Sequence, residues 1–478
     1  MTALTKIIRT SLPVVVIGAG PVGLAAAAHL VVRNIPVKLL EAGSEVGAHV
    51  RDWGHVQLFS PWSYNIDKAA RALLDRNGWQ APKRSLHPTG AELYEQYLKP
   101  LAATPEIAAV LECDARVTGV SRLGFDKMKS AGRDHAPFSV IVQHKDGRER
   151  QELASAVIDT SGTWTQHNPI GGNGLPVPGE TAARDAIAYG VPDVLGRDAA
   201  HYAGKRILVI GAGHSAANVL LDLAKLKDSA PATEIVWAVR GASLARLFGG
   251  GANDKLAARG ALGQALETLV KAGGIDLHMH STVTCIEVSA ALGVTLATPG
   301  GADQTLEVDR IIAATGQRPD LAMLREIRLD LDPATESPRV LAPMIDPNMH
   351  SCGTVRPHGH RELAQPDSGF YIAGIKSYGR APTFLLATGY EQVRSIVAAL
   401  AGDMMAADDI QLDLPETGVC STNLPKVTGV EGDGERCGTS CCGTPEPVPA
   451  ATACCTRANE TAVKAGQQAR PVAATACC

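Results

Sequence analysis

Two glycine-rich segments of the same pattern occur in this 478-residue chain, at residues 18–23 and 211–216. Each follows a short apolar run typical of a buried strand, at residues 14–17 and 207–210, and precedes a helix-like segment. Glycines at such a junction permit a tight turn and let the backbone approach a pyrophosphate, which the helix N-terminus then stabilises. The pattern therefore predicts two dinucleotide sites, with contacts from Gly18, Gly20, Gly23, Gly211, Gly213 and Ser215.

The residue at the end of the next apolar run distinguishes the two predicted nucleotides. Glu41 ends that run after the first glycine segment, and Arg240 ends it after the second. A carboxylate at this place accepts hydrogen bonds from ribose hydroxyls, whereas an arginine accommodates a 2′-phosphate. The sequence therefore predicts FAD at the first site, bound in part by Glu41, and NADPH at the second, bound in part by Arg240.

The charge balance and hydropathy exclude several classes of partner. The formal net charge is −4 and no lysine-arginine block occurs, so we expect neither nucleic acid nor an anionic membrane as a partner. Residues 12–32 are apolar enough to suggest a signal or membrane segment, but Gly18, Gly20, Pro21 and Gly23 interrupt them where the turn requires. We therefore expect a cytoplasmic protein. The sequence leaves a homodimer open.

The cysteines are concentrated near the C-terminal end. Of the 11 cysteines, eight follow residue 419, and six of these eight form three adjacent pairs. Neighbouring Cα atoms are too close for an easy disulfide, whereas two soft thiolates suit one thiophilic ion. Residues 406–478 also lack the apolar content of a core, which predicts a flexible tail. The predicted metal or metalloid ligands are Cys441, Cys442, Cys454, Cys455, Cys477 and Cys478.

The cysteine pairs are compatible with more than one role. Repeated adjacent pairs resemble those of arsenite-handling metallochaperones and mercury-handling reductases, which favours trivalent arsenic, antimony or another thiophilic species. A thiol redox relay is an alternative, and storage of zinc or copper, or no role for the pairs, are the others. Structural zinc has less support, because Cys437, Cys441 and Cys442 lack the paired C-x-x-C spacing of common zinc modules.

The order of these features resembles that of the two-dinucleotide-binding-domain flavoproteins, which include flavin monooxygenases, thioredoxin reductases and disulfide reductases. In that superfamily an NADPH domain is inserted into an FAD domain, and residues 160–162 and 314–316 resemble its two hinge signatures. Residues 370–374 resemble the last strand, which closes over the flavin, although Ile375-Lys376 stand where an aspartate commonly follows. The resemblance implies further cofactor contacts from Thr315, Gly316 and Gly374.

The same resemblance predicts an α/β fold. An FAD-binding Rossmann-like domain would contain an inserted NADPH-binding Rossmann-like domain and be followed by a disordered C-terminal tail. Helices are predicted near residues 91–101 and 383–400. The expected boundaries are 1–165 and 319–405 for the two parts of the FAD-binding domain, 166–318 for the NADPH-binding domain and 406–478 for the Cys-rich tail.

The position of the thiols separates two activities within this superfamily. A disulfide reductase needs a dithiol beside the flavin, but residues 42–59 contain no cysteine and the NADPH unit holds only Cys285. The flavin monooxygenase branch fits better, since residues 47–53 loosely resemble its glycine–tryptophan loop, although its linker signature is not met before Lys205. No acid or base stands out, and Trp53 and His55 are the candidates near the flavin.

We therefore predict an FAD- and NADPH-dependent monooxygenase that uses O₂ to oxidise a soft nucleophile such as arsenite or antimonite. The alternative is an NADPH-dependent flavoprotein reductase of a thiol, a disulfide or a thiophilic metal that the Cys-Cys tail delivers. The two differ in one requirement, because only the monooxygenase needs O₂.

Overall fold

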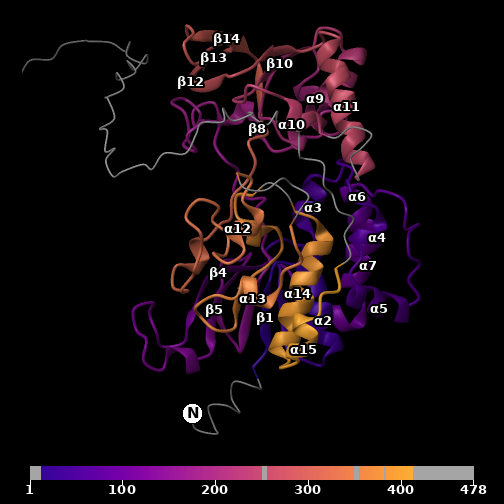
Figure 1. Ribbon diagram of the computed structural model, residues 1–478, viewed down its shortest axis with the longest axis vertical. Coiled ribbons are helices and arrows are strands. Elements are labelled where there is room, and N and C mark those ends of the chain that lie inside the picture. The colour runs from indigo at the N-terminus through magenta and orange to yellow at the C-terminus, as the bar shows by residue number, and fades with distance from the viewer. Residues whose placement is uncertain (1–11, 250–255, 349–354, 382–383, 413–478) are drawn as a thin grey trace, which may run out of the picture. The chain divides into compact units, whose positions relative to one another are not determined.

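The computed structural model describes residues 12–249, 256–348, 355–381 and 384–412, which all belong to one compact unit (Figure 1). The predicted Cys-Cys ligands and Cys352 lie outside these residues. Within the described ranges, no helix is both long and apolar enough to cross a membrane.

The first parallel sheet has five short strands in the order β16-β7-β1-β2-β3. Its central strand, β1, is buried at every position because both faces of the sheet are covered. On one face, α2 (Pro21–Val32) packs against α14 (Leu386–Leu400), and the two helices lie side by side in Figure 1. The strands are β1 (Val14–Ile17), β2 (Val37–Leu40), β3 (Leu111–Glu112), β7 (Ala156–Asp159) and β16 (Phe370–Ile372).

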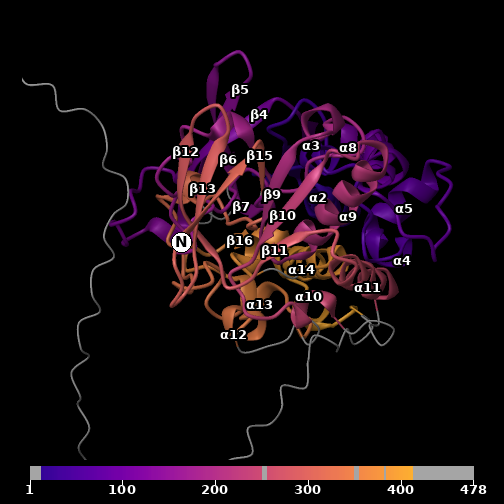
Figure 2. The same ribbon diagram turned by 90° about the horizontal axis from the view of Figure 1, so that it is seen from above.

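The second parallel sheet also has five strands, in the order β11-β10-β9-β15-β8. The helix α9 (His214–Ser229) packs on β9 and β10, and α11 (Ala257–Lys271) packs on α9 (Figure 2). The strands are β8 (Ile187–Tyr189), β9 (Arg206–Ile210), β10 (Glu234–Ala238), β11 (Asp276–His278) and β15 (Arg310–Ala313).

Each parallel sheet is accompanied by an antiparallel sheet of three strands. Val15 and Ile17 of β1 share a core with the first antiparallel sheet, whereas Val14 and Val16 face the helices. Alternate residues of one strand thus serve two different layers, as the period of a strand requires. The antiparallel strands are β4 (Ala115–Arg122), β5 (Phe138–His144) and β6 (Glu149–Ala154) in the first, and β12 (Thr282–Val288), β13 (Leu292–Ala297) and β14 (Gln304–Val308) in the second.

The two halves follow the same plan except for the place of one strand. In both, the strand before the glycine turn is central, and the strand after the antiparallel sheet lies beside it. The edge strand beyond this supporting strand differs in its place along the chain. It is the last strand of the first half, β16, but the first strand of the second half, β8. Because the second half is inserted between β7 and β16, the structure confirms the predicted α/β fold of one Rossmann-like unit within another.

The remaining helices are short and mostly connect strands. The helix expected at residues 383–400 begins at Leu386, because Leu385 before it has extended backbone angles. The helix expected near residues 91–101 is present as α6 (Gly90–Leu93), the π-helix η1 (Tyr94–Leu98) and α7 (Lys99–Ala102). The others are α3 (Ala48–Asp52), α4 (Trp62–Asn65), α5 (Lys68–Arg76), α8 (Pro105–Ala108), α10 (Ala245–Phe248), α12 (Ala342–Ile345), α13 (His360–Leu363) and α15 (Met404–Asp408), with the 3-10 turns η2 (Arg133–His135), η3 (Arg184–Ala186), η4 (Ala199–His201), η6 (Ala322–Leu324) and η7 (Gly374–Tyr378).

A fully buried ion pair connects segments far apart in the chain. Arg133 donates to both carboxylate oxygens of Asp367 at 2.9 and 2.8 Å and to the carbonyl oxygens of Asp126 and Glu326. Burial by itself would raise the pKa of Asp367, but the hydrogen bonds from Arg133 and Arg328 and the Arg133 charge outweigh it and lower that pKa. The carboxylate therefore stays ionised in the folded protein.

Removal of this carboxylate should destabilise the fold, because it leaves a buried guanidinium unpaired. We expect Asp367→Ala to lower the free energy of unfolding by about 3–5 kcal/mol, measured by urea denaturation. The matched control is Asp146→Ala, whose exposed pair with Arg148 should cost less than about 1 kcal/mol. Because folding lowers the pKa of Asp367, its stabilisation is present above the unfolded-state pKa of about 3.9 and is lost as the pH falls through the folded-state value.

Candidate functional site

The first glycine turn, residues 18–23, combines two packed glycines with one open glycine. A Cβ on Gly18 would lie 2.9 Å from the Cα of Ser161, and one on Gly23 would lie 1.8 Å from the carbonyl oxygen of Gly18. A Cβ on Gly20 would meet nothing within 4 Å. Gly18 also has a φ of +92°, which disfavours other residues. Gly18 and Gly23 are thus required by packing, and Gly20 leaves space for a ligand.

The second glycine turn, residues 211–216, repeats this arrangement. Gly211 has a φ of +131°, and a Cβ on it would lie 2.2 Å from the carbonyl oxygen of Ala314. A Cβ on Gly213 would meet nothing within 4 Å, and Ala216 is fully buried in the third position. Gly20 and Gly213 cap α2 and α9 without a side-chain hydrogen bond, so N–H groups of both first turns remain for an anionic ligand.

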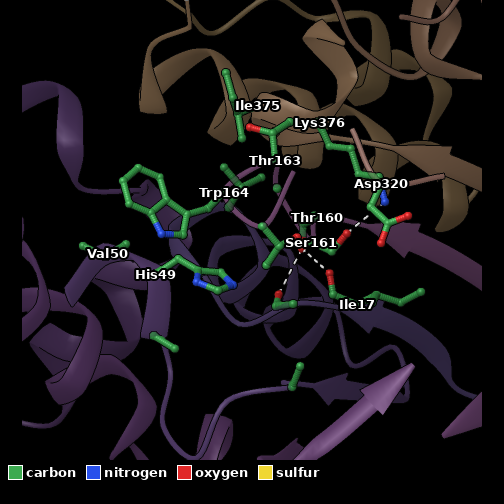
Figure 3. Close-up of a pocket in the computed structure, with 18 of the residues that line it drawn as sticks. Ile17, His49, Val50, Thr160, Ser161, Thr163, Trp164, Asp320, Ile375 and Lys376 are labelled. Carbon is green, nitrogen blue, oxygen red and sulfur yellow. Dashed lines mark hydrogen bonds between the residues drawn. The ribbon is translucent and has the colours of Figure 1, made fainter. Parts of the chain in front are cut away.

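A cavity of about 670 Å³ lies at the carboxyl ends of the first sheet (Figure 3). This volume is within the ordinary range for cofactor sites. Its lining includes Gly18, Gly20, Glu41 and Gly374 from the first half and Ser215 from the second. The first glycine turn therefore opens into a space that a residue of the second glycine turn also reaches.

Glu41 is buried beside the first glycine turn, where the sequence predicts a ribose-binding carboxylate. Its two carboxylate oxygens accept hydrogen bonds from the backbone N–H groups of Ala19 at 2.6 Å and Gly43 at 2.8 Å. Each carboxylate oxygen has a second lone pair, so Glu41 keeps acceptor capacity toward the cavity that it lines. The backbone contacts fix the orientation of the side chain.

The other predicted cofactor residues lie outside the lining of this cavity. Thr315 and Gly316 join the two chain crossings instead: the Thr315 hydroxyl donates to the carbonyl oxygen of Asn168 at 2.6 Å, and the Asn168 N–H donates to Gly316 at 2.9 Å. Arg240 is exposed, and its guanidinium donates to the carbonyl oxygen of Gly172 at 2.7 Å. Cofactor roles for these three residues, as for the residues that line the cavity, stay predictions.

Of the two catalytic candidates, only Trp53 lines the cavity. Its indole packs against Gly90, where a Cβ would lie 2.7 Å from the ring. The buried Nε2 of His55 has no hydrogen-bond partner among the described residues, but His55 lines neither this cavity nor the smaller one beside it. His49 and Trp164, which sequence reasoning did not select, do line the larger cavity and are labelled in Figure 3.

A second cavity, of about 280 Å³, shares Trp53 and Ser215 with the first. Its remaining lining is mainly apolar and includes Phe59, whose ring meets the edge of His214 with centroids 5.1 Å apart. No Asp, Glu, Lys, Arg or Cys from the described residues lines it. Water in this space would find few polar partners.

A buried ion pair that sequence reasoning missed borders the large cavity. Lys376 donates to the carboxylate of Asp159 at 2.7 Å and to the hydroxyl of Ser161 at 3.0 Å, and neither charged side chain is exposed. Asp159 ends β7 and Lys376 follows β16, and these parallel strands are neighbours. The pair therefore fixes the turn after β7, which packs on Gly18. The only sequence signal was the departure from the expected aspartate near Gly374.

No cysteine among the described residues lines either cavity. Burial, with a smaller effect of the Glu41 charge, raises the pKa of Cys113 to about 11, so its thiol is protonated at neutral pH. The described ranges contain no group of three or more His, Cys, Asp or Glu side chains that could hold a metal ion. The predicted metalloid ligands all lie beyond those ranges.

Comparisons with known proteins support this fold. An NAD(P)-binding Rossmann-like domain family matches residues 16–81, and the L-lysine 6-monooxygenase/L-ornithine 5-monooxygenase family matches residues 87–247. No curated protein sequence matches the chain significantly. The solved structures named below are distant in sequence.

Three of these structures represent two activities. The bacillithiol disulfide reductase Bdr of Bacillus cereus has 19% identity and a TM-score of 0.61 over 82% of this chain and 99% of its own. The cadaverine monooxygenase DfoA of Erwinia amylovora, bound to FAD, has 13% identity and a TM-score of 0.59 over 84% and 97%. The ornithine N-hydroxylase KtzI of Kutzneria sp. 744 has 15% identity and a TM-score of 0.54 over 82% and 99%. This chain shares their fold.

The open positions at Gly20 and Gly213 generate a paired prediction. We expect the purified protein to be yellow from bound FAD, and Gly20→Val to be largely colourless because the new side chain fills the pyrophosphate space. Gly213→Val is the matched control, since it should keep FAD and lose affinity for NADPH. Flavin absorbance and NADPH titration measure the two effects. Normal flavin content in Gly20→Val would contradict the assignment of the first glycine turn.

Proposed function

We propose that this protein is an FAD- and NADPH-dependent oxidoreductase of the monooxygenase type. The two glycine turns supply the two dinucleotide sites, and Ser215 from the second reaches the cavity of the first. DfoA and KtzI, which share the fold, carry FAD in their solved structures, and that of KtzI also holds NADP⁺. FAD occupies the large cavity, and NADPH binds at the N-terminus of α9.

The observation that favours oxygen over a disulfide as the electron acceptor is that the cavity has no cysteine in its lining from the part of the chain that the structure describes. No described cysteine lines it, and the thiol of Cys113 is protonated at neutral pH. A reductase of disulfides would need a thiol within reach of the flavin. In the monooxygenase reaction, NADPH, H⁺, O₂ and substrate give NADP⁺, water and the oxygenated substrate, so NADPH supplies both electrons.

Bound FAD supplies hydride acceptance and oxygen activation, and the residues of this chain supply position and exclusion of water. Gly18, Gly20 and the first turn of α2 hold the pyrophosphate, and Glu41 holds the ribose. The Lys376–Asp159 pair fixes the turn that supports them. Trp53 and the apolar lining of the small cavity keep water from the reacting atoms.

A soft nucleophile such as arsenite or antimonite is the substrate that the whole sequence favours. The three Cys-Cys pairs of the tail are soft ligands for a trivalent metalloid. Capture by a tethered ligand raises the local substrate concentration near the cavity. The tail therefore delivers the substrate, and the flavin site oxidises it.

The second candidate is an NADPH-dependent reductase, which the shared fold with a bacillithiol disulfide reductase keeps open. In that case the tail would bring its own thiols or bound metal to the flavin. The decisive measurement is NADPH oxidation with and without O₂, at several arsenite and antimonite concentrations. A monooxygenase stops without O₂ and consumes it in proportion to substrate, whereas undiminished anaerobic turnover would establish the reductase.

Deletion of the tail tests its role separately. We expect removal of residues 416–478 to leave FAD content and thermal stability nearly unchanged, and to lower turnover at low arsenite but not at saturation. The matched control is the full-length chain with the six paired cysteines changed to Ser, which should behave like the deletion. Identical arsenite curves for all three proteins would remove the tail from catalysis. Loss of activity at every concentration would place its thiols on the electron path.

A further inference from the structure

Three arginines from separate parts of the chain converge on one turn at residues 171–174. Arg240, after β10, donates to the carbonyl oxygen of Gly172 at 2.7 Å. Arg318, after β15, donates to the carbonyl oxygen of Gly174 at 3.3 Å and to the side chain of Asn168 at 2.9 Å. Arg380, after η7, places Nη2 within 3.7 Å of the position that a Cβ on Gly174 would take, and Arg318 places its own within 3.8 Å.

No carboxylate of the described residues neutralises the charges of these arginines. Within the described ranges, none of the three forms an ion pair with a carboxylate, although Arg339 and Arg148 each pair at 2.6 to 2.7 Å. The side-chain partners of Arg240 and Arg318 are neutral carbonyl and amide oxygens. Like charges so arranged repel one another unless an anion lies between them. Arg240 and Arg380 are exposed, so such an anion can enter from solvent.

We propose that Arg318 and Arg380, together with Arg240, form a site for a phosphate monoester dianion at the 171–174 turn. Guanidinium groups match phosphate oxygens by paired hydrogen bonds. The favoured source is the 2′-phosphate of NADPH, because Arg240 follows β10, the neighbour of β9 that leads into the second glycine turn. This assignment rests on the proposed function. It adds Arg318 and Arg380 as residues that select NADPH over NADH.

The three arginines come from three different segments of the chain, so all three segments must be in place to form the phosphate site. Arg240 belongs to the second half, Arg318 to the returning chain crossing, and Arg380 to the end of the first half. Phosphate bound among them therefore connects the crossing to both halves. The Arg318 Nε donates to the Asn168 Oδ1 at 2.9 Å, so the Arg318 guanidinium is already positioned before a ligand binds.

The test compares the affinity of the FAD-loaded protein for adenosine 2′,5′-bisphosphate with its affinity for 5′-AMP, both measured by calorimetry. We expect the wild-type protein to prefer the bisphosphate, and Arg318→Ala and Arg380→Ala each to reduce that preference by about ten- to a hundredfold. Arg240→Ala should do the same, and 5′-AMP affinity should stay unchanged. Arg148→Ala is the matched control, since it removes an equal charge at an exposed site elsewhere. Flavin content and Tm report whether each variant is folded.

The outcomes separate the two proposals. Equal affinity of the wild-type protein for both nucleotides would overturn the NADPH preference itself. Discrimination that is lost in Arg240→Ala but intact in Arg318→Ala and Arg380→Ala would overturn only the present inference. Titration with inorganic phosphate distinguishes the source of the phosphate group. If the Arg318 and Arg380 variants lose phosphate binding but still discriminate between the two nucleotides, the site binds free phosphate and not NADPH. Partial recovery in Arg318→Lys would indicate that charge, rather than support of the turn, carries the effect.

Discussion

Both dinucleotide sites depend on one steric constraint, the close approach of a glycine turn to the end of a neighbouring strand. At Gly18 the neighbouring backbone is that of Thr160 and Ser161 after β7, and at Gly211 it is that of Ala314 after β15. A Cβ would collide with backbone atoms at both places, where no side-chain rotation can relieve the contact. The open positions at Gly20 and Gly213 follow from this packing, because it directs the free face of each turn and the N–H groups of the next helix toward the ligand.

The repeated plan of the two halves explains how a residue of the second glycine turn can reach the cavity beside the first. Each half has a central strand, a glycine turn and a supporting strand after an antiparallel sheet. The insertion between β7 and β16 leaves two crossings, and hydrogen bonds between Asn168 and Thr315 hold them together. The crossing geometry, rather than either half alone, decides that Ser215 reaches the cavity of the first glycine turn.

Buried charge is placed where the fold must stay fixed. The Lys376–Asp159 pair joins the ends of β7 and β16, and Arg133 with Asp367 secures the other end of β16. A buried ion pair contributes little net stability, but loss of either partner destabilises the fold because it leaves the other charge unpaired. Such pairs therefore fix the position of the segments they join more than they raise the stability. The large cavity is accordingly bordered by fixed groups, while its chemistry is left to bound cofactors.

The amino-acid sequence by itself determined the two glycine turns, the place of Glu41 and the insertion of one half in the other. The turns and Glu41 are local features, because a strand, a turn and a helix within about 30 residues carry their signal. The insertion was implied by a resemblance, through the order of the two units and the two hinge signatures at residues 160–162 and 314–316. Tertiary structure alone decided that Trp53 lines the cavity and His55 does not, that Thr315 and Gly316 join the crossings, and that Lys376 meets Asp159 across 217 residues. It also brought Arg240, Arg318 and Arg380 to one turn. Such contacts depend on strand order and on the path of the crossings, and residue spacing along the chain encodes neither.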